Sequence, residues 1–307
     1  MKKILITTSS FGKEDKTPLN ILEKKGFQIT LNPYGRELKP EESIELMNEI
    51  EFLIAGTEKL NREVLSHSPH LKMISRCGAG MDNVDLAYAK ERGIAVKNTP
   101  MGPTHAVAEL TLGLILDLLR NISLSNNELK AGNWKKRMGN LLHKKVIGII
   151  GLGNIGKRLV ELLAPFECRI IAADPYPDNK FASDRDIKYV SLEELLKTSD
   201  VITIHAPICN ETHCLVNINT LSEINHNAIL INTSRGKIID EKALFECLKA
   251  GNLKGAALDV FEKEPYSGEL CSLHNIILTP HIGSYAKEAR VSMEIDSVMN
   301  ILDFLGE

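Results

Sequence analysis

A glycine-rich run between an apolar strand and a helix constrains this chain more than any other feature. The run is Gly-Leu-Gly-Asn-Ile-Gly at 151–156, and the apolar stretch 146–150 precedes it. Residues 157–163 have the pattern of an amphipathic helix, and the stretch 168–173 predicts the next strand. Such a β-α-β unit is typical of dinucleotide-binding domains, in which the helix N-terminus receives a pyrophosphate.

Each glycine of the run has an expected role, and an acidic residue completes the pattern. Gly151 allows the tight turn, Gly153 lets the backbone approach the pyrophosphate, and Gly156 allows close packing of helix on strand. Asp174 lies 18 residues after Gly156, near the spacing of the carboxylate that binds the adenosine ribose. A carboxylate there repels the additional phosphate of NADP, so the pattern predicts NAD as the cofactor.

Composition excludes several other classes of protein. The 307 residues, 43% of them hydrophobic and 25% charged, suggest about two globular domains. The net charge of −3 gives no basic footprint for nucleic acid or for a membrane surface. The apolar run near the start ends at Thr7, too early for a signal peptide, and Glu109 and Asp117 interrupt the apolar stretch 106–119. We therefore expect a cytoplasmic protein that binds neither membrane nor nucleic acid.

The cysteine pattern predicts reduced thiols and no metal site. The six cysteines form no CxxC pair, in a chain too large to need disulfides. His205, Cys209, His213 and Cys214 lie close in sequence, but Pro207 prevents them from sharing a helical face. Their spacing matches no familiar zinc site.

Two series of alternating strands and helices predict the domain organisation. The first has expected strands at 4–8, 27–31, 52–55, 71–75 and 94–97. The second has them at 146–150, 168–173, 201–204, 228–232, 256–259 and 276–278. No strand follows the final helix, 286–304, so we expect it to return to the first domain. The predicted fold is α/β, with two doubly wound parallel-sheet domains: 1–99 with 285–307, and an inserted 100–284. A cleft between the two domains is the expected ligand site.

Several separate motifs together resemble the D-isomer-specific 2-hydroxyacid dehydrogenase family, and in particular its short phosphoglycerate dehydrogenases. Besides the glycine run they are Ser-Arg-Cys-Gly-Ala-Gly-Met-Asp-Asn-Val-Asp (75–85), Asn-Thr-Pro (98–100), Ala-Val-Ala-Glu-Leu (106–110), His-Ala-Pro (205–207), Asn-Thr-Ser-Arg-Gly (232–236), Ala-Leu-Asp-Val-Phe (257–261), Glu-Pro (264–265) and Thr-Pro-His-Ile-Gly (279–283). The resemblance implies a flavodoxin-like substrate domain, 1–99 and 285–307, and a Rossmann NAD-binding domain, 100–284. It also implies hydride transfer between NAD(H) and a small D-2-hydroxy acid or 2-oxo acid.

The resemblance assigns the catalytic roles to Arg235, Glu264 and His281. A guanidinium can hold the substrate carboxylate in a forked pair, which is the role expected of Arg235. Reduction places negative charge on the carbonyl oxygen, so a proton donor with a pKa near neutrality is needed, and His281 is expected to be that acid. A carboxylate beside the imidazole stabilises its protonated form, which is the expected role of Glu264.

The resemblance also implies a set of binding residues. For the cofactor they are Gly151, Gly153, Asn154, Ile155, Gly156, Asp174, His205, Pro207, Thr212, Thr233, Ser234, Asp259 and Gly283. Asp259 is expected to contact the nicotinamide carboxamide, with a strand-end cap as the alternative. For the substrate they are Arg76, Cys77, Gly78 and Ala79, with Arg235 and His281; the small residues of this loop are expected to expose backbone N–H groups to the substrate carboxylate. Asp82 and Asn83 are expected to cap the following helix.

The substrate stays open at this point. Phosphoglycerate dehydrogenases often carry a phosphate-binding arginine where this chain has Ala55, although Lys59 and Arg76 lie nearby. The pair 3-phosphoglycerate/3-phosphohydroxypyruvate, glyoxylate, hydroxypyruvate and a phosphite-type reaction therefore remain alternatives, whereas Glu264 in place of glutamine argues against the formate dehydrogenase branch. Because the chain ends at Glu307, we expect no C-terminal regulatory domain.

Two further expectations concern assembly and a different class of function. Most relatives resembling this chain are dimers, and the helix 106–119 with the segment around Trp134 would suit a homodimer interface. An intramolecular core helix is the alternative. An NAD(H)-sensing binding protein or corepressor-like scaffold is the alternative to an enzyme.

Overall fold

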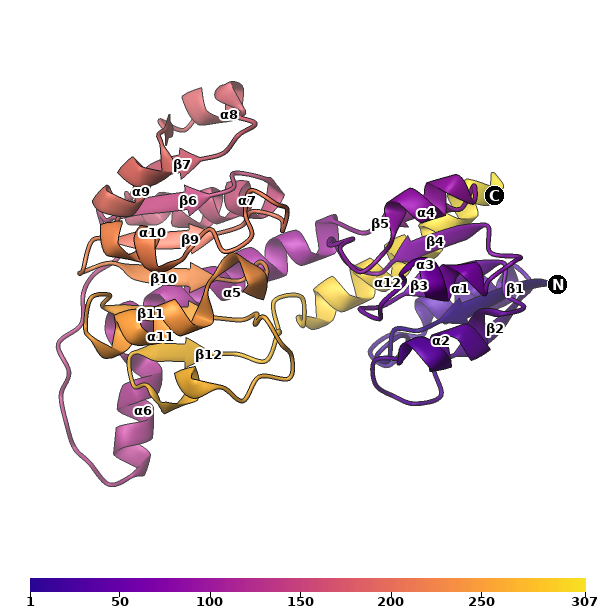
Figure 1. The fold of residues 1–307 in the computed structure, drawn as a ribbon, viewed down its shortest axis with the longest axis horizontal. Coiled ribbons are helices and arrows are strands. Elements are labelled where there is room, and N and C mark those ends of the chain that lie inside the picture. Colours follow the sequence, from indigo (N-terminus) through magenta and orange to yellow (C-terminus); the bar gives the residue numbers. More distant parts are fainter. The chain divides into compact units, whose positions relative to one another are not determined.

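The computed structural model describes residues 1–307, which divide into two compact units. Met1–Pro103 with Ser284–Glu307 form the first unit, and Thr104–Gly283 form the second. Each unit contains one parallel sheet flanked by helices (Figure 1). The predicted α/β fold class with two doubly wound sheets is confirmed.

The first unit has a five-stranded sheet with the order β2-β1-β3-β4-β5, a flavodoxin-like arrangement. Its strands are β1 (Lys2–Ile6), β2 (Phe27–Leu31), β3 (Phe52–Ala55), β4 (Met73–Arg76) and β5 (Ala95–Asn98), all paired in parallel. Its helices are α1 (Thr17–Lys24), α2 (Pro40–Met47), α3 (Arg62–Ser66), α4 (Leu86–Glu91) and α12 (Lys287–Leu305).

Apolar side chains seal both faces of this sheet, because strands covered on both sides carry near-continuous apolar runs. Ile4 and Ile54 pack with Leu22 of α1 and Ile301 of α12 on one face. The other face packs against α2, α3 and α4 through residues such as Leu53. The polar residues therefore lie mainly at the two ends of the strands.

The second unit has a seven-stranded sheet with the order β12-β11-β10-β9-β6-β7-β8. Its strands are β6 (Val146–Ile150), β7 (Arg169–Ala173), β8 (Lys188–Tyr189), β9 (Val201–Ile204), β10 (Ile229–Asn232), β11 (Gly255–Leu258) and β12 (Ile276–Leu278). Chain order reverses at β6, which pairs with β7 on one side and β9 on the other. This is the Rossmann order with one added strand, and such a reversal is where open α/β sheets bind ligands.

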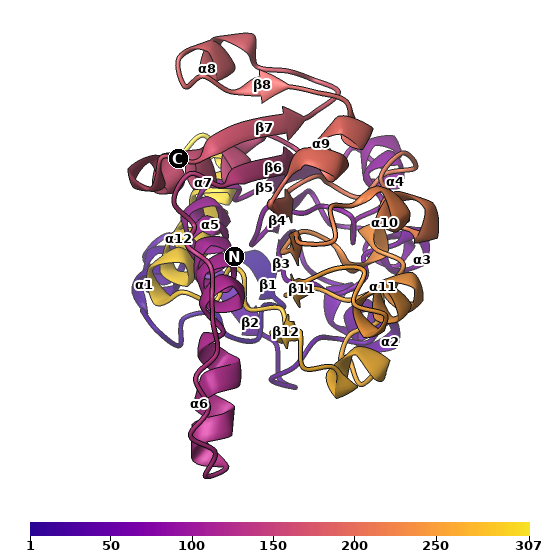
Figure 2. The same cartoon turned by 90° about the vertical axis from the view of Figure 1, so that its left-hand side faces the viewer.

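Helices cover both faces of the second sheet (Figure 2). One core layer lies under α5 (Met101–Arg120) and α7 (Asn154–Leu163). The other layer lies under α9 (Leu192–Thr198), α10 (Ile218–Glu223) and α11 (Glu241–Lys249). The short α8 (Asn179–Ser183) leads to β8 at the sheet edge.

Two elements depart from the expected pattern. The polar stretch after α5 contains the helix α6 (Ile122–Lys130), which has no buried residue and extends away from its sheet (Figures 1 and 2). A helix without a buried face lacks the periodic apolar signal that reveals amphipathic helices. The two-residue strand β8 is too short to give an alternating pattern.

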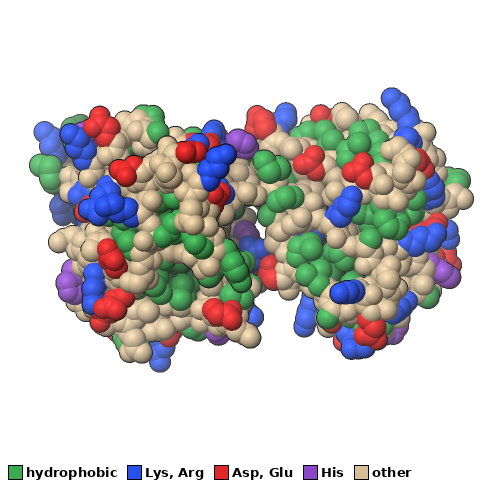
Figure 3. Space-filling model, turned by 90° about the horizontal axis from the view of Figure 1, so that it is seen from above, with side chains coloured by type: hydrophobic (Ala, Val, Ile, Leu, Met, Phe, Trp, Pro, Cys, Tyr) green, Lys and Arg blue, Asp and Glu red, His purple; other side chains and the backbone are tan.

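The surface is mixed in charge, and no helix has the length and apolar character needed to cross a bilayer. On the face shown in Figure 3, acidic and basic side chains alternate without a continuous field of one sign.

Candidate active site

The glycine-rich turn between β6 and α7 has the geometry that a pyrophosphate requires. Gly151 has φ +89°, and a Cβ there would lie 2.7 Å from Ala206 N. A Cβ at Gly156 would lie 2.8 Å from Gly151 O, whereas Gly153 faces open space. No side chain caps the N-terminus of α7. Its first N–H groups therefore suit an anion, and the residues present fit a dinucleotide.

Asp174 lies where β7 ends, beside this turn. Its Oδ2 accepts from Leu152 N at 2.8 Å and its Oδ1 from Tyr176 N at 2.8 Å. These two bonds fix the carboxylate, and each oxygen keeps a lone pair that can accept from a ribose hydroxyl.

Hydrogen bonds join the loops that follow β9 and β10. Ser234 Oγ donates to Ala206 O, and Thr212 Oγ1 donates to Pro207 O at 2.7 Å. Thr233 Oγ1 lies 3.1 Å from the buried hydroxyl of Thr111 on α5. Burial lowers the pKa of His205 to about 4, so this imidazole is neutral near pH 7. The loops thus form a rigid rim at the carboxyl edge of the sheet.

Arg235, Glu264 and His281 follow three neighbouring strands, β10, β11 and β12. Because these strands are parallel, their carboxyl ends share one edge of the sheet. His281 Nδ1 lies 2.8 Å from Glu264 Oε2, and Glu264 Oε1 accepts from Phe261 N at 3.0 Å. Arg235 Nη1 donates to Ser234 O at 2.7 Å. The Glu264 contact leaves His281 Nε2 as the ring atom that can exchange a proton with a ligand.

The charges of this cluster set its protonation. The hydrogen bond to Glu264 raises the pKa of His281 above its ordinary value, against the opposing effects of burial and of Arg235. Burial alone would raise the pKa of Glu264, but the hydrogen bonds from His281 and Phe261 outweigh it and the pKa is lowered. The pair therefore holds a proton on the imidazole to a higher pH than an isolated histidine would.

Asp259 organises the turn that carries His281. Its side chain is fully buried; Oδ1 accepts from Thr279 Oγ1 at 2.6 Å and Ile282 N at 2.8 Å, and Oδ2 accepts from Gly283 N at 2.8 Å. His281 has φ +52°, a left-handed conformation that surrounding bonds must hold in place. The structure thus gives Asp259 the role of a strand-end cap. A contact of Asp259 or Gly283 with the nicotinamide stays a prediction.

In the first unit, Arg76, Cys77, Gly78 and Ala79 form the loop that ends β4. Arg76 Nη1 donates to Cys77 O, and a Cβ at Gly78 would lie 2.0 Å from that Nη1, so the guanidinium covers the loop. Cys77 N donates to Ala55 O at 2.9 Å, and Gly78 N to Thr99 Oγ1 at 2.7 Å. These two N–H groups are engaged within the unit and are not open to a substrate. Exposure of the other N–H groups of the loop to a substrate stays a prediction.

Comparison with known proteins identifies the family. Residues 112–283 match the model of the D-isomer specific 2-hydroxyacid dehydrogenase, NAD binding domain. The chain belongs to this family. NAD is accordingly its cofactor, and the dehydrogenase resemblance seen in the sequence is confirmed.

Similar proteins within the family differ in their named substrates. The chain is 37% identical to a hydroxypyruvate reductase of Thermotoga maritima over 93% of its own length and 96% of the relative. It is 40% identical to a D-3-phosphoglycerate dehydrogenase of Methanocaldococcus jannaschii over 94% of its length, but spans 55% of that relative. The solved structure of the TT0316 protein from Thermus thermophilus matches with a TM-score of 0.91 at 34% identity, covering 99% of this chain and 97% of that one.

The helix that follows the loop after β4 is capped differently from the prediction. Asp85, not Asp82 or Asn83, caps α4, because its Oδ1 accepts from Tyr88 N at 2.9 Å. Asn83 Nδ2 instead donates to Glu58 O at 2.8 Å and Gly56 O at 3.2 Å. Asn83 thus ties its own turn to the loop after β3.

Sequence reasoning did not single out Thr279 and Thr99, whose hydroxyls hold two of the candidate turns: Thr279 Oγ1 donates to Asp259 Oδ1, and Thr99 Oγ1 accepts from Gly78 N. Both precede a proline within a motif, and that position was the available signal. The hydrogen-bond partners of a threonine hydroxyl cannot be read from such a motif.

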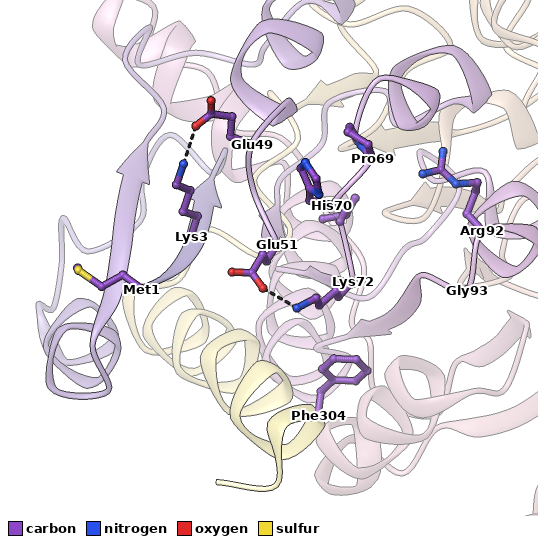
Figure 4. A pocket seen from close by; sticks show the side chains of 11 residues that line it. Met1, Lys3, Glu49, Glu51, Pro69, His70, Lys72, Arg92, Gly93 and Phe304 are labelled. Carbon is purple, nitrogen blue, oxygen red and sulfur yellow. Dashed lines mark hydrogen bonds and ion pairs between the residues drawn. The ribbon is translucent and has the colours of Figure 1, made fainter.

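A cavity of about 610 Å³ in the first unit is lined by none of these residues; Figure 4 shows its lining. Its lining includes Glu51 and Lys72, which directly precede β3 and β4, and Gly93, two residues before β5, at the amino ends of the strands. Lys3 pairs with Glu49 at 2.5 Å and Lys72 with Glu51 at 2.6 Å across it. Open α/β sheets bind ligands at the opposite edge, so this cavity is not the candidate active site of the dehydrogenase.

Proposed function

We propose that this dehydrogenase transfers hydride between NAD(H) and a small 2-oxo acid, interconverting it with the D-2-hydroxy acid. The observation that carries the proposal is the 2.8 Å contact between His281 Nδ1 and Glu264 Oε2. These residues follow β12 and β11, and Arg235 follows the neighbouring strand β10. An acid with a raised pKa and a guanidinium at one sheet edge match the carbonyl and the carboxylate of a 2-oxo acid.

In the direction of reduction, the chain contributes binding and proton transfer. NADH supplies the hydride that the carbonyl carbon receives. Arg235 holds the substrate carboxylate in a forked pair. His281 delivers the proton from Nε2 to the carbonyl oxygen, and Glu264 stabilises the imidazolium before transfer. Oxidation of the hydroxy acid runs these steps in reverse, with neutral His281 as the base.

Oxidation of NADH against a panel of 2-oxo acids tests the proposal. The panel contains glyoxylate, hydroxypyruvate, pyruvate and 3-phosphohydroxypyruvate. Turnover of at least one of them, dependent on His281, supports a 2-oxo acid reductase. Absence of turnover on all of them would favour a substrate of another class or the NAD(H)-sensing alternative.

The pH dependence is expected to report the Glu264–His281 pair. Reduction requires protonated His281, so its rate is lost as pH rises through the raised pKa. Glu264→Gln removes the stabilising charge, so the loss is expected at lower pH in the variant. Oxidation requires neutral His281 and should extend to lower pH in the same variant. Identical pH–rate profiles for the two proteins would contradict the role given to Glu264.

Cofactor choice is expected to depend on Asp174. A 2′-phosphate beside this carboxylate costs several kcal/mol, so kcat/KM with NADH should exceed that with NADPH by about 100-fold or more. Asp174→Ser should narrow the ratio, whereas Asp184→Ser, which removes an exposed acid of the same unit, should not. Equal use of both cofactors by the unaltered protein would refute the prediction.

The helix expected at 106–119 lies within α5, and its apolar side chains pack in the core of the second unit, as in the intramolecular alternative. We therefore propose that a homodimer forms through the segment around Trp134, together with α6. Trp134 is 83% exposed and Met138 96% exposed, and α6 has no buried residue. Exposed apolar side chains gathered on one segment mark an association surface. Light scattering after size-exclusion chromatography should give twice the 34.0 kDa of one chain. Trp134→Glu with Met138→Glu should halve that mass, and a single-chain mass for the unaltered protein would exclude the dimer.

A further inference from the structure

The loop that follows β3 carries a buried carboxyl group at the carboxyl edge of the first sheet. Glu58 is 1% exposed and lies three residues after the end of β3. Ala55, the last residue of β3, pairs in register with Arg76, the last residue of β4. Glu58 therefore lies beside the loop that is expected to bind substrate, at the sheet edge where ligands of open α/β sheets bind.

Glu58 takes up the hydrogen-bond donors at the ends of β1 and β3. Its Oε1 accepts from Thr7 Oγ1 at 2.5 Å and from Gly56 N at 3.3 Å. The neighbouring hydroxyl of Thr8 is buried and has no hydrogen-bond partner in the chain. Gly56 N also donates to Thr7 Oγ1 at 3.0 Å, so this N–H, the Thr7 hydroxyl and the Glu58 carboxyl group form one hydrogen-bonded set. A backbone N–H and a hydroxyl at strand ends are donors that suit an anion, and here an internal carboxyl group is bound to them.

The surrounding backbone holds Glu58 firmly in this place. A Cβ at Gly56 would lie 2.9 Å from Glu58 Oε2, so the glycine makes room for the carboxyl group. Asn83 Nδ2 donates to the carbonyl of Glu58, and Leu60 N donates to the carbonyl of Asn83 at 2.8 Å. The carboxyl group is thus built into the loop and is buried.

Glu58 also places an ionisable group close to Arg76 at this edge of the sheet. Burial raises the pKa of Glu58, while the hydrogen bond from Thr7 and the charge of Arg76 oppose the rise. The carboxyl group thus lies close enough to Arg76 for their charges to interact. Lys59, the residue after Glu58, is exposed. The donors Thr7 Oγ1 and Gly56 N are thus already bound to a carboxyl group inside the unit.

We infer that Glu58 determines specificity: it fills an anion subsite of the first unit and restricts the enzyme to 2-oxo acids whose distal end is not phosphorylated. The inference rests on the proposed function, which assigns the substrate to this edge. It also agrees with Ala55, which stands where phosphoglycerate dehydrogenases often carry an arginine. Next to the same strand end, this chain thus lacks a cation and has an acid.

Substrate ratios of Glu58 variants test the inference. For each protein, kcat/KM is measured for 3-phosphohydroxypyruvate and for hydroxypyruvate, which differ only in the phosphoryl group. Glu58→Ala is expected to raise the phosphorylated-to-unphosphorylated ratio by about tenfold or more. Glu63→Ala removes an exposed acid from α3 nearby and should leave the ratio unchanged. An unchanged ratio in Glu58→Ala would overturn the inference.

Two additions keep the test decisive. Glu58→Gln preserves the size of the side chain and an acceptor for Thr7, and serves if the alanine variant fails to fold; its ratio should also rise. Calorimetric binding of 3-phosphoglycerate, which needs no turnover, should be detectable for the variant and at least tenfold weaker for the unaltered protein. Equal affinities would overturn the inference even if the unaltered protein reduces other 2-oxo acids. Lack of turnover with clearly different affinities would instead count against the proposed function alone.

Discussion

Replacing His281 with alanine is expected to lower kcat for 2-oxo acid reduction by about 10²–10⁴-fold, the usual contribution of a positioned general acid. Glu264 holds the imidazole at Nδ1, and Asp259 holds the turn that carries His281. Two independent sets of hydrogen bonds thus fix the orientation of the ring that donates the proton. Alanine removes the proton donor but leaves Asp259 and its backbone contacts in place. The glycine-rich turn also remains, and NADH affinity should therefore change by less than about twofold.

The comparison requires a histidine that lies outside the site. His274 is exposed on the same unit and precedes β12, so His274→Ala is the matched control. Steady-state kinetics and NADH fluorescence titration on both variants separate chemistry from binding. If His281→Ala keeps more than a tenth of the unaltered kcat, His281 is not the general acid.

Much of the fold could be predicted because strands covered on both faces have continuous apolar runs in the sequence. The stretches 146–150, 201–204 and 276–278 were predicted with the bounds that the structure gives. The polar helix α6 was not, because nothing in its composition distinguishes it from a loop. A sequence reveals the elements that bury a face and conceals those that do not.

The candidate site was predictable to a different degree. The glycine run and the acid after β7 could be derived from turn geometry, since few residues satisfy it. Arg235, Glu264 and His281 came from resemblance, and their convergence depends on the pairing of β10, β11 and β12, which sequence order alone does not fix. What escaped prediction were side-chain bonds to backbone atoms, such as those of Asn83 and Asp259. These depend on three-dimensional register and leave no pattern along the chain.

Arg235→Lys is expected to lower kcat/KM for the 2-oxo acid by about 100-fold, mainly through KM, because a charged hydrogen-bond partner contributes about 1.5–3 kcal/mol and lysine cannot reproduce the fork. The substitution keeps the positive charge near His281, so the pH profile should keep its shape. An unchanged pH profile would show that the loss comes from the missing forked contact and not from a changed pKa of His281. Arg169→Lys, at an exposed arginine where β7 begins, is the control and should behave as the unaltered protein. A large loss of kcat with unchanged KM would place Arg235 in the chemical step alone, and a change of less than about threefold in kcat/KM would remove it from substrate binding altogether.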